Sequence, residues 1–346
     1  MNNEGTRLED VPGVGPAAAK ELREHHIVNA EYLARQSYTA LNWTTKLGEA
    51  TCQKIVKNAR KLLGYTFQNG LEIANYQKDC MRLSTGIDTL DRKLIGGFPI
   101  GSMVEVHGPY RGGKSHLMHH MAVRAQLPIE QGGLESNVLW LRTGQSFRTL
   151  SIRAAALRYG LDSDTALNNI LVHEVINREH FKDTLQLVPE MIAESGARVI
   201  VIDSLGGLFQ VEYSNLGHRE AVERELAGAM HTLRDITRAA DGICLFTNHV
   251  FTALNNYGNL TSPMNGHIIG HGSDYRFFLR IGIQGRRKMS LRAAPDIPAF
   301  DVELEIGWGG FFADTTTKKA TEQEIYPKLD LHPKTKNTNE GVKIID

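Results

Sequence analysis

The chain of 346 residues has little cysteine, no net charge and no long apolar run. Its cysteines, Cys52, Cys80 and Cys244, are far apart and form no Cys-x-x-Cys pair, which argues against a disulfide framework or a zinc site. Lys plus Arg and Asp plus Glu both number 39, so any contact with nucleic acid must come from local patches. No apolar stretch is long enough to span a bilayer, and the N-terminus does not resemble a signal peptide. We therefore expect a soluble intracellular protein with no membrane partner.

The segment Gly-Pro-Tyr-Arg-Gly-Gly-Lys-Ser at 108–115 matches G-x-x-x-x-G-K-[ST], the Walker A phosphate loop. An alternating stretch at 101–107 predicts a strand before it, and residues 116–124 predict a helix after it. In that context, backbone N–H groups of the loop and the helix N-terminus bind phosphate. We expect the nucleotide to contact Gly108, Pro109, Tyr110, Arg111, Gly112, Gly113, Lys114, Ser115 and His116. Lys114 would neutralise phosphate charge and act in catalysis, and Ser115 would hold Mg²⁺.

A second nucleotide element lies at 198–204, where an apolar run ends in Asp203. A buried strand that delivers an aspartate at its carboxyl end is the Walker B pattern, and Asp203 would be the second Mg²⁺ ligand. Apolar runs at 137–141, 169–173 and 242–249 alternate with helical stretches. This alternation predicts a mostly parallel α/β sheet with helices on both faces, which binds ligands at the carboxyl ends of its strands.

The chain divides into four parts: residues 1–63, a linker at 64–82, the core at 83–315 and a charged, flexible tail at 316–346. In the first part, a tight turn with Gly13 and Gly15 leads into an alanine-rich helix. This is typical of a helix-hairpin-helix, whose backbone N–H groups can contact a DNA phosphate. A later helix at 49–63 has Lys54 and Lys57 largely on its exposed side, which fits DNA contact or an ordinary solvated face.

Together these residues resemble the RecA/RadA class of strand-exchange recombinases, most closely an archaeal RadA or a divergent paralogue of one. The resemblance runs from about Leu8 to Ile306. Its markers are Pro-Gly-Val-Gly-Pro at 12–16, Leu-Ser-Thr-Gly at 83–86, Gly-Gly at 96–97, the Walker A loop, Gln-Leu-Pro at 126–128, Ile-Asp-Ser at 202–204, Tyr-Ser at 213–214, Thr-Asn at 247–248 and Gly-His-Ile-Ile-Gly-His at 266–271.

The resemblance implies a RecA-like P-loop ATPase core, a small all-α helix-hairpin-helix N-terminal domain, and ATP and Mg²⁺ as cofactors. It also implies homologous recombination and DNA repair as the process, with single- or double-stranded DNA as partner. It further implies a homo-oligomer, or a hetero-oligomer with a recombinase, with ATP at subunit interfaces. The location would be cytoplasmic and nucleoid-associated in an archaeon, and nuclear in a eukaryote.

Departures from the family affect catalysis first. The family has a water-activating glutamate where this chain has Gly144. A glycine cannot accept a proton, and general-base help is typically worth about 100- to 10,000-fold, so we expect reduced hydrolysis. The neighbouring Gln145 is a candidate to orient a water, as glutamine does in some GTPases. His249 replaces the sensor glutamine after Thr-Asn and can still hydrogen-bond a phosphate.

Other departures affect DNA binding. The first DNA-binding loop, at 209–218, has no arginine, and the second, at about 251–265, has no charge, which predicts weak phosphate contact. Arg148 and Tyr257 are candidate DNA contacts, the tyrosine by stacking on a base.

The subunit contacts of the family are altered too. Ala293 stands where the ATP-capping segment usually has an aspartate. The oligomerisation motif Phe-x-x-Ala appears as Phe67-Gln-Asn-Gly70, and the missing methyl weakens docking by about 0.8 kcal/mol.

Three functions remain open at this stage. The first is an ATP-binding RadA-like paralogue with reduced hydrolysis, and the second is an active DNA-dependent ATPase that forms strand-exchange filaments. The third is a structural adaptor of a recombinase complex that keeps ATP for stability. His116 and His120, at i and i+4, have the spacing of a zinc pair, but without a third ligand we expect ordinary helix histidines.

Overall fold

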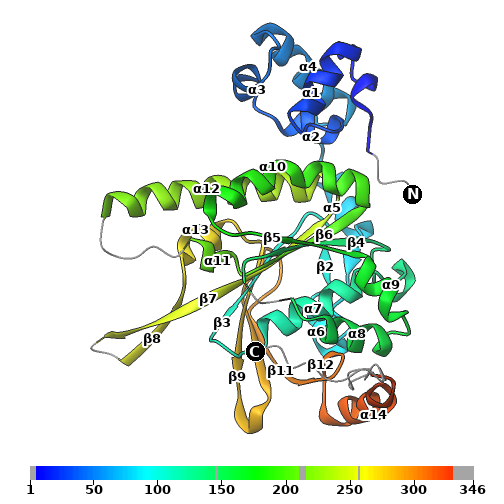
Figure 1. Ribbon diagram of the computed structural model, residues 1–346, viewed down its shortest axis with the longest axis vertical. Helices are drawn as coiled ribbons and strands as arrows, with labels where there is room; N and C mark the ends of the chain where they lie inside the picture. Colours follow the sequence, from blue (N-terminus) through cyan, green and yellow to red (C-terminus); the bar gives the residue numbers. More distant parts are fainter. Residues whose placement is uncertain (1–4, 145–146, 210–215, 256–257, 330–346) are drawn as a thin grey trace, which may run out of the picture.

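The protein is described here from a computed structural model that covers residues 5–144, 147–209, 216–255 and 258–329. A small helical unit lies above a larger α/β unit (Figure 1). The elements of the small unit are η1 (Leu8–Asp10), α1 (Pro16–Glu24), α2 (Ala30–Arg35), α3 (Tyr38–Thr44) and α4 (Glu49–Leu62).

The small unit has an apolar core of its own, in which Leu22, Leu33 and Ile55 are fully buried. Between this unit and the large one, ion pairs join polar side chains. His26 Nδ1 lies 2.9 Å from a carboxylate oxygen of Glu190, and Arg35 lies 3.7 Å from Asp235. Charged pairs of this kind are screened by salt, so they orient the unit more than they stabilise it.

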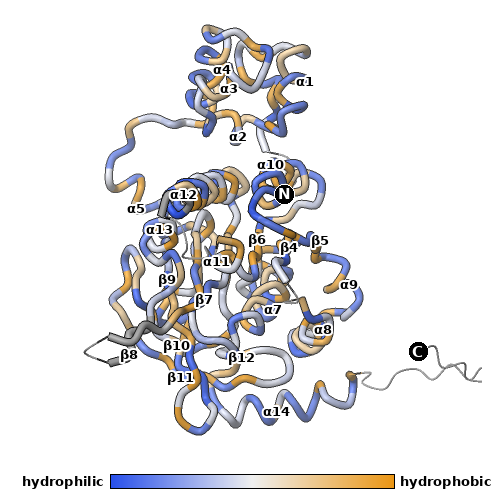
Figure 2. Tube along the Cα trace, turned by 60° about the vertical axis from the view of Figure 1, so that its left-hand side comes forward, coloured by the Kyte–Doolittle hydropathy of each residue, from blue (hydrophilic) through white to orange (hydrophobic). Residues whose placement is uncertain are grey.

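The segment between the two units contains a helix, within the stretch expected to be a linker. Residues between α4 and α5 (Gly70–Asp79) bow away from both units (Figure 2). A capping box starts α5: the Asn69 side chain accepts from Glu72 N, and the Glu72 carboxylate accepts from Asn69 N. All of α5 is described, and none of its side chains is buried. Phe67, just before it, is fully exposed.

The large unit is built on a sheet of order β12-β11-β10-β9-β3-β7-β6-β4-β5, with β8 paired to β7. The strands are β3 (Met103–Gly108), β4 (Asn137–Arg142), β5 (Ile170–Glu174), β6 (Ala197–Asp203), β7 (Ile243–Asn255), β8 (Gly258–Pro263), β9 (Tyr275–Ile281), β10 (Arg287–Ala293), β11 (Phe300–Gly307) and β12 (Gly310–Phe312). The central strands from β9 to β5 pair in parallel, whereas β10, β11 and β12 add antiparallel. The predicted fold class, a mostly parallel RecA-like α/β core, is confirmed.

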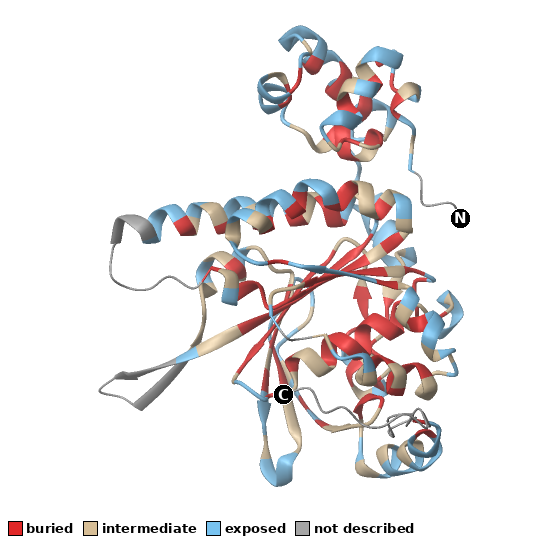
Figure 3. Ribbon diagram, in the orientation of Figure 1, coloured by how far each residue is buried: buried red, intermediate tan, exposed pale blue. Residues whose placement is uncertain are grey.

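Helices cover both faces of this sheet, because side chains alternate along each buried strand. On β4, Leu139 and Leu141 join the apolar cluster of α10 and α12, whereas Val138 and Trp140 join that of α7 and α8. Burial is accordingly highest along the central strands (Figure 3).

The remaining elements are β1 (Arg82–Leu83), α6 (Asp88–Lys93), β2 (Phe98–Pro99), α7 (Lys114–Arg124), η2 (Ile129–Gln131), α8 (Thr149–Arg158), α9 (Ser163–Asn168), α10 (Arg178–Ser195), α11 (Leu205–Leu208), α12 (Leu216–Ala239), α13 (Gly266–His271), η3 (Ile283–Gly285), α14 (Thr315–Ile325) and η4 (Tyr326–Lys328). In the part of the chain that is described, no helix has the length and apolar character needed to cross a bilayer.

The expected tail from residue 316 is in part a helix. The Asp314 side chain accepts from Thr317 N and caps α14. Ile325, at the end of α14, is buried in a cluster with Ala154 of α8. The expectation of a flexible tail is therefore wrong for residues 315–329, because a cap and an apolar contact offset the charged composition. Residues 330–346 lie outside the described part.

The expected second DNA loop is largely a β-hairpin. The strand β7 continues to Asn255 and pairs antiparallel with β8, from Val250 opposite Pro263 to Asn255 opposite Gly258. The hairpin projects from the sheet (Figure 1). The β-branched Val250, Thr252 and Thr261 favour strands over a loop in this segment.

A buried polar network joins the strands that lead to the carboxyl edge. Glu105 on β3 is fully buried, and its carboxylate accepts from Arg276 Nε at 2.6 Å and from Asn248 Nδ2 at 2.9 Å. The Asn248 amide also donates to Met264 O at 2.8 Å. The network thus connects β3, β7 and β9 with the base of the β7–β8 hairpin.

Replacing Arg276 with alanine should lower the free energy of unfolding by about 3–5 kcal/mol, because it leaves a buried carboxylate without its cation. Arg286→Ala is the matched control, since Arg286 pairs with Glu305 at 2.8 Å but is 40% exposed. Arg286→Ala should lower the free energy of unfolding by less than about 1 kcal/mol. Urea unfolding followed by circular dichroism measures both, and equal losses would contradict the role assigned to the buried pair.

Candidate functional site

The loop after β3 has the geometry that a phosphate loop needs. A side chain at Gly108 is excluded, because its Cβ would lie 2.0 Å from the carbonyl oxygen of Leu279 on β9. Gly113 has φ +108, a left-handed conformation that favours glycine, and it is the N-cap of α7. Lys114, the first residue of α7, is buried and donates to Gly108 O at 2.9 Å and to Pro109 O at 3.0 Å. The loop therefore folds around its own lysine.

The residues of the second nucleotide element lie at the same edge of the sheet. Gly108 is opposite His249 in the β3–β7 register, and Arg142 is opposite Asp203 in the β4–β6 register. The Asp203 carboxylate accepts a hydrogen bond from the hydroxyl of Thr247 on β7. Parallel pairing thus brings the carboxyl ends of β3 and β6 beside residues 247–249 in the middle of β7.

A pocket of about 550 Å³ opens at this edge. Its lining combines the loop with the ends of β4, β6 and β7: Tyr110, Ser115, His116, His119, Thr143, Gly144, Arg148, Ser151, Asp203, Ser204 and His249. Arg148, expected from the sequence to contact DNA, lies in this wall. Its backbone N–H donates to Nε2 of His119 on α7 at 2.8 Å, and contact of its side chain with DNA stays a prediction.

Burial lowers the pKa of Lys114, and the nearby Asp203 opposes that change. Burial also lowers the pKa of His249, with Lys114 adding to the effect. A neutral imidazole at position 249 can donate one hydrogen bond to a phosphate oxygen. This edge of the sheet is therefore suited to an anion, with a lysine cation at the start of α7 and a neutral histidine on β7.

Gly144 stands at the pocket mouth on a segment tied to the end of β6. Thr143 N donates to Asp203 O at 3.2 Å, the Thr143 hydroxyl donates to Ser204 O at 2.9 Å, and Ser204 N donates to that hydroxyl at 2.6 Å. No heavy atom of the described residues lies within 4 Å of a Cβ at Gly144, but its φ of +154 is rare for residues with side chains. Space exists for a carboxylate, whereas the backbone is set for glycine. Gln145 lies outside the described residues.

The histidines of α7 each contact a backbone carbonyl. His116 Nε2 lies 3.0 Å from Gly307 O, and His120 Nε2 lies 2.7 Å from Thr85 O. His119 Nδ1 donates to Ser115 O while its Nε2 accepts from Arg148, and its ring lies 4.7 Å from that of Trp140. Burial lowers the pKa of all three, to about 4 for His119. Among the described residues, no group of three or more His, Cys, Asp or Glu is arranged to hold a metal ion.

The other predicted site residues lie away from this pocket. Gly13, with φ +96, and Gly15, the N-cap of α1, form the turn of the small unit beside Lys54 of α4. Phe67 and Gly70 lie in the exposed segment at the start of α5. Tyr257 lies outside the described residues.

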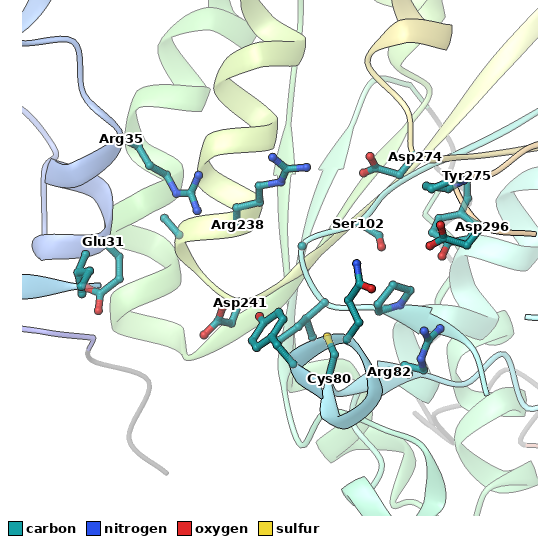
Figure 4. Close-up of a pocket in the computed structure, with 18 of the residues that line it drawn as sticks. Glu31, Arg35, Cys80, Arg82, Ser102, Arg238, Asp241, Asp274, Tyr275 and Asp296 are labelled. Carbon is teal, nitrogen blue, oxygen red and sulfur yellow. The ribbon is translucent and has the colours of Figure 1, made fainter. Parts of the chain in front are cut away.

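A larger cleft of about 850 Å³ lies at the opposite edge of the sheet, between the small unit, α5 and the start of β9. Figure 4 shows Arg35 and Arg238 on one side and Asp274, Tyr275 and Asp296 on the other. Residues of the 108–115 loop and of the first turn of α7 line the smaller pocket, and none of them lines this cleft. The phosphate-binding geometry therefore belongs to the smaller pocket.

The fold and this loop define the class of the protein, a RecA-like α/β core with a phosphate-loop motif at the carboxyl ends of its strands. The sequence model of the Rad51 family matches residues 76–314, so the chain belongs to the Rad51 family. It is 33% identical over 314 residues to the DNA repair and recombination protein RadA of Methanoculleus marisnigri, which covers 86% of this chain and 96% of that protein. It is also 30% identical over 317 residues to the protein of the same name from Cenarchaeum symbiosum, covering 90% of this chain and 80% of that protein. The resemblance noted from the sequence is confirmed at the level of the family.

Sequence reasoning missed His119, Thr143 and Thr247. His119 is at i+4 from Ser115, so a helical periodicity places both on one face of α7. Thr143 follows β4 and Thr247 lies within β7, and both contact Asp203 by hydrogen bonds. All three act through hydrogen bonds that hold the pocket residues in place.

The stability of the protein should depend on the neutrality of His119. Because its pKa is about 4 when folded and about 6.5 when unfolded, the unfolded state binds the extra proton between these values. The stabilisation is complete above about pH 6.5 and decreases by about 1.4 kcal/mol per pH unit as the pH falls toward 4. Urea unfolding from pH 7.5 to 4.5 should show this slope reduced in His119→Gln. Parallel pH curves for the two proteins would contradict it.

Proposed function

We propose that this chain is an ATP- and Mg²⁺-binding RadA-like protein that acts in homologous recombination and DNA repair with little ATP hydrolysis of its own. The observation that carries the proposal is the pocket that Ser115, Asp203 and Gly144 line, beside Lys114, with glycine where the family has a carboxylate. The names of the RadA relatives support the process.

The residues present fit a bound nucleotide. Lys114 exchanges its contacts with Gly108 O and Pro109 O for phosphate oxygens, at little cost because the partners are both oxygen acceptors. Ser115 and Asp203 are the ligands available for Mg²⁺, which neutralises phosphate charge when bound. His249, opposite Gly108 in the β3–β7 register, would be available to donate to a phosphate oxygen.

Among the described residues that line this pocket, Asp203 is the only carboxylate that could take a proton from water. Asp203 is engaged by Thr247, and the described histidines of α7 have their ring nitrogens directed at backbone groups. Without a general base the rate is expected to fall by about 100- to 10,000-fold. ATP then serves mainly to fix the conformation of the edge that β3, β6 and β7 share.

Contact with DNA is assigned to the small unit. Lys54 and Lys57 of α4 are exposed, and the Lys54 stem lies 3.3 Å from a Cβ at Gly13, so cation and hairpin turn share one surface. Arg60, by contrast, is used within the unit, since its Nε donates to Ala34 O at 2.8 Å. The exposed Phe67 is the anchor proposed for contact with a neighbouring subunit, which is a second copy or a recombinase.

A structural adaptor is the second candidate function. The uncharged segment 251–265 favours it, because polyanions bind poorly where cations are absent. This candidate retains ATP binding and a mixed assembly with a recombinase but predicts no DNA affinity at physiological salt.

ATP turnover by the protein with single-stranded DNA should equal that of Lys114→Ala. Gly144→Glu should raise turnover, by at most about 10,000-fold, because it supplies the missing base. Gly144→Ala is the matched control, since it strains the same backbone without adding a carboxylate, and its rate should stay at the wild-type level. An ATP turnover rate of the wild type well above that of Lys114→Ala would contradict the proposed low hydrolysis and favour an active recombinase.

DNA affinity should depend on α4. For duplex DNA, the Lys54→Ala/Lys57→Ala variant should reduce the slope of log affinity against log salt by up to about 2, at about 0.9 per lost phosphate contact. Fluorescence anisotropy from 50 to 200 mM salt measures it. The control, Lys319→Ala/Lys328→Ala, removes two exposed lysines from α14 and η4 and should leave the slope unchanged. Equal slopes in both variants would contradict the assignment, and no binding by the wild type would favour the adaptor.

A further inference from the structure

Arg287, the first residue of β10, lies beside the phosphate loop although it is far from it in sequence. Its Nε is 3.6 Å from the position that a Cβ at Gly113 would take. Side chains alternate along β10, so Arg287 shares a face with Met289 and Leu291, which pack in the cluster of α7. The guanidinium therefore points toward the N-terminus of α7, where the loop ends.

The hydrogen-bonding capacity of this side chain is only partly used. One terminal nitrogen donates to Gly285 O, and Nε is buried without a partner among the described residues. The flanking cations differ: Arg286 pairs with Glu303 and Glu305, and Lys288 pairs with Asp301 at 2.6 Å, whereas no carboxylate of the described residues lies within ion-pair distance of Arg287. Arg287 is thus a permanent cation whose Nε donor has no hydrogen-bond partner among the described residues.

The surroundings favour an anion as its partner. His116, on the first turn of α7, is kept neutral in part by the positive charge of Arg287. Phe311 and Ile306 lie 3.1 and 3.3 Å from the same Cβ position at Gly113, so an apolar wall limits access of water to this side of the loop. A guanidinium whose Nε edge is free matches two oxygens of one phosphate group.

We propose that Arg287 is a phosphate-binding residue of the nucleotide site, donating from its Nε edge to a phosphate group held by the loop that ends at Gly113. The assignment rests on the nucleotide-binding function proposed above. It adds a cation from the antiparallel part of the sheet to Lys114 from the parallel part. Binding the phosphate would then link the β9–β10 hairpin to the loop.

The test compares Arg287→Ala with Arg280→Ala by isothermal titration calorimetry, using ADP and inorganic tripolyphosphate as probes. Arg280 is the matched control, because it is an exposed arginine on the paired strand β9, where it lies opposite Lys288. Arg287→Ala should lose roughly ten- to a hundredfold in affinity for both probes, as expected for a hydrogen-bonded charge pair. Arg287→Lys should lose less, and Arg280→Ala should stay within about twofold of the wild type.

Thermal unfolding without nucleotide separates binding from structure. Arg287→Ala should unfold at the wild-type temperature, because no ion pair among the described residues is lost, while its shift in Tm with ADP should shrink. Unchanged affinities, or a loss for ADP but not for tripolyphosphate, would overturn the phosphate contact. A wild type that binds neither probe would instead refute the nucleotide-binding function itself.

Discussion

The close approach of β9 to the end of β3 is the constraint on which the nucleotide edge depends. Leu279 O occupies the position that a side chain of residue 108 would take, so the last residue of β3 has to be a glycine. It turns through the left-handed Gly113 and enters α7, whose N-terminus then faces the space above β3 and β7. Because β10 follows β9 in the sheet, the same contact also brings Arg287 to the loop.

Binding and proton transfer depend on different parts of this pocket. The phosphate loop, Lys114 and Asp203 depend on strand ends whose positions are fixed by parallel pairing. The residue that would activate water depends on one side chain at the end of β4, where Gly144 leaves open space. A pocket of this kind can retain its ligand-dependent conformation after it has lost turnover.

Local chemistry made the loop and the sheet predictable from sequence. The loop and the sheet could be predicted from the glycine spacing, the Lys-Ser pair and the apolar run before Asp203. Each of these features reflects what the backbone nearby requires. Arg287 was not predictable, since its relation to Gly113 depends on how β9 and β10 pair. The hydrogen bond from Arg148 N–H to His119 was not predictable for the same reason, because the two residues lie on different elements. The helix α14 was missed because a cap at Asp314 and the burial of Ile325 outweigh a charged composition.

The helix α5 also has a mechanical consequence. It is ten residues long, and none of its side chains is buried. Isolated helices of this length are only marginally stable in water, so α5 depends on the Asn69–Glu72 capping box and on its contacts with other residues. A ten-residue segment spans roughly 15 Å as a helix and about 33 Å when extended, so melting α5 would lengthen the connection by about 18 Å. The distance that the small unit can reach from the sheet therefore depends on whether α5 is helical or extended.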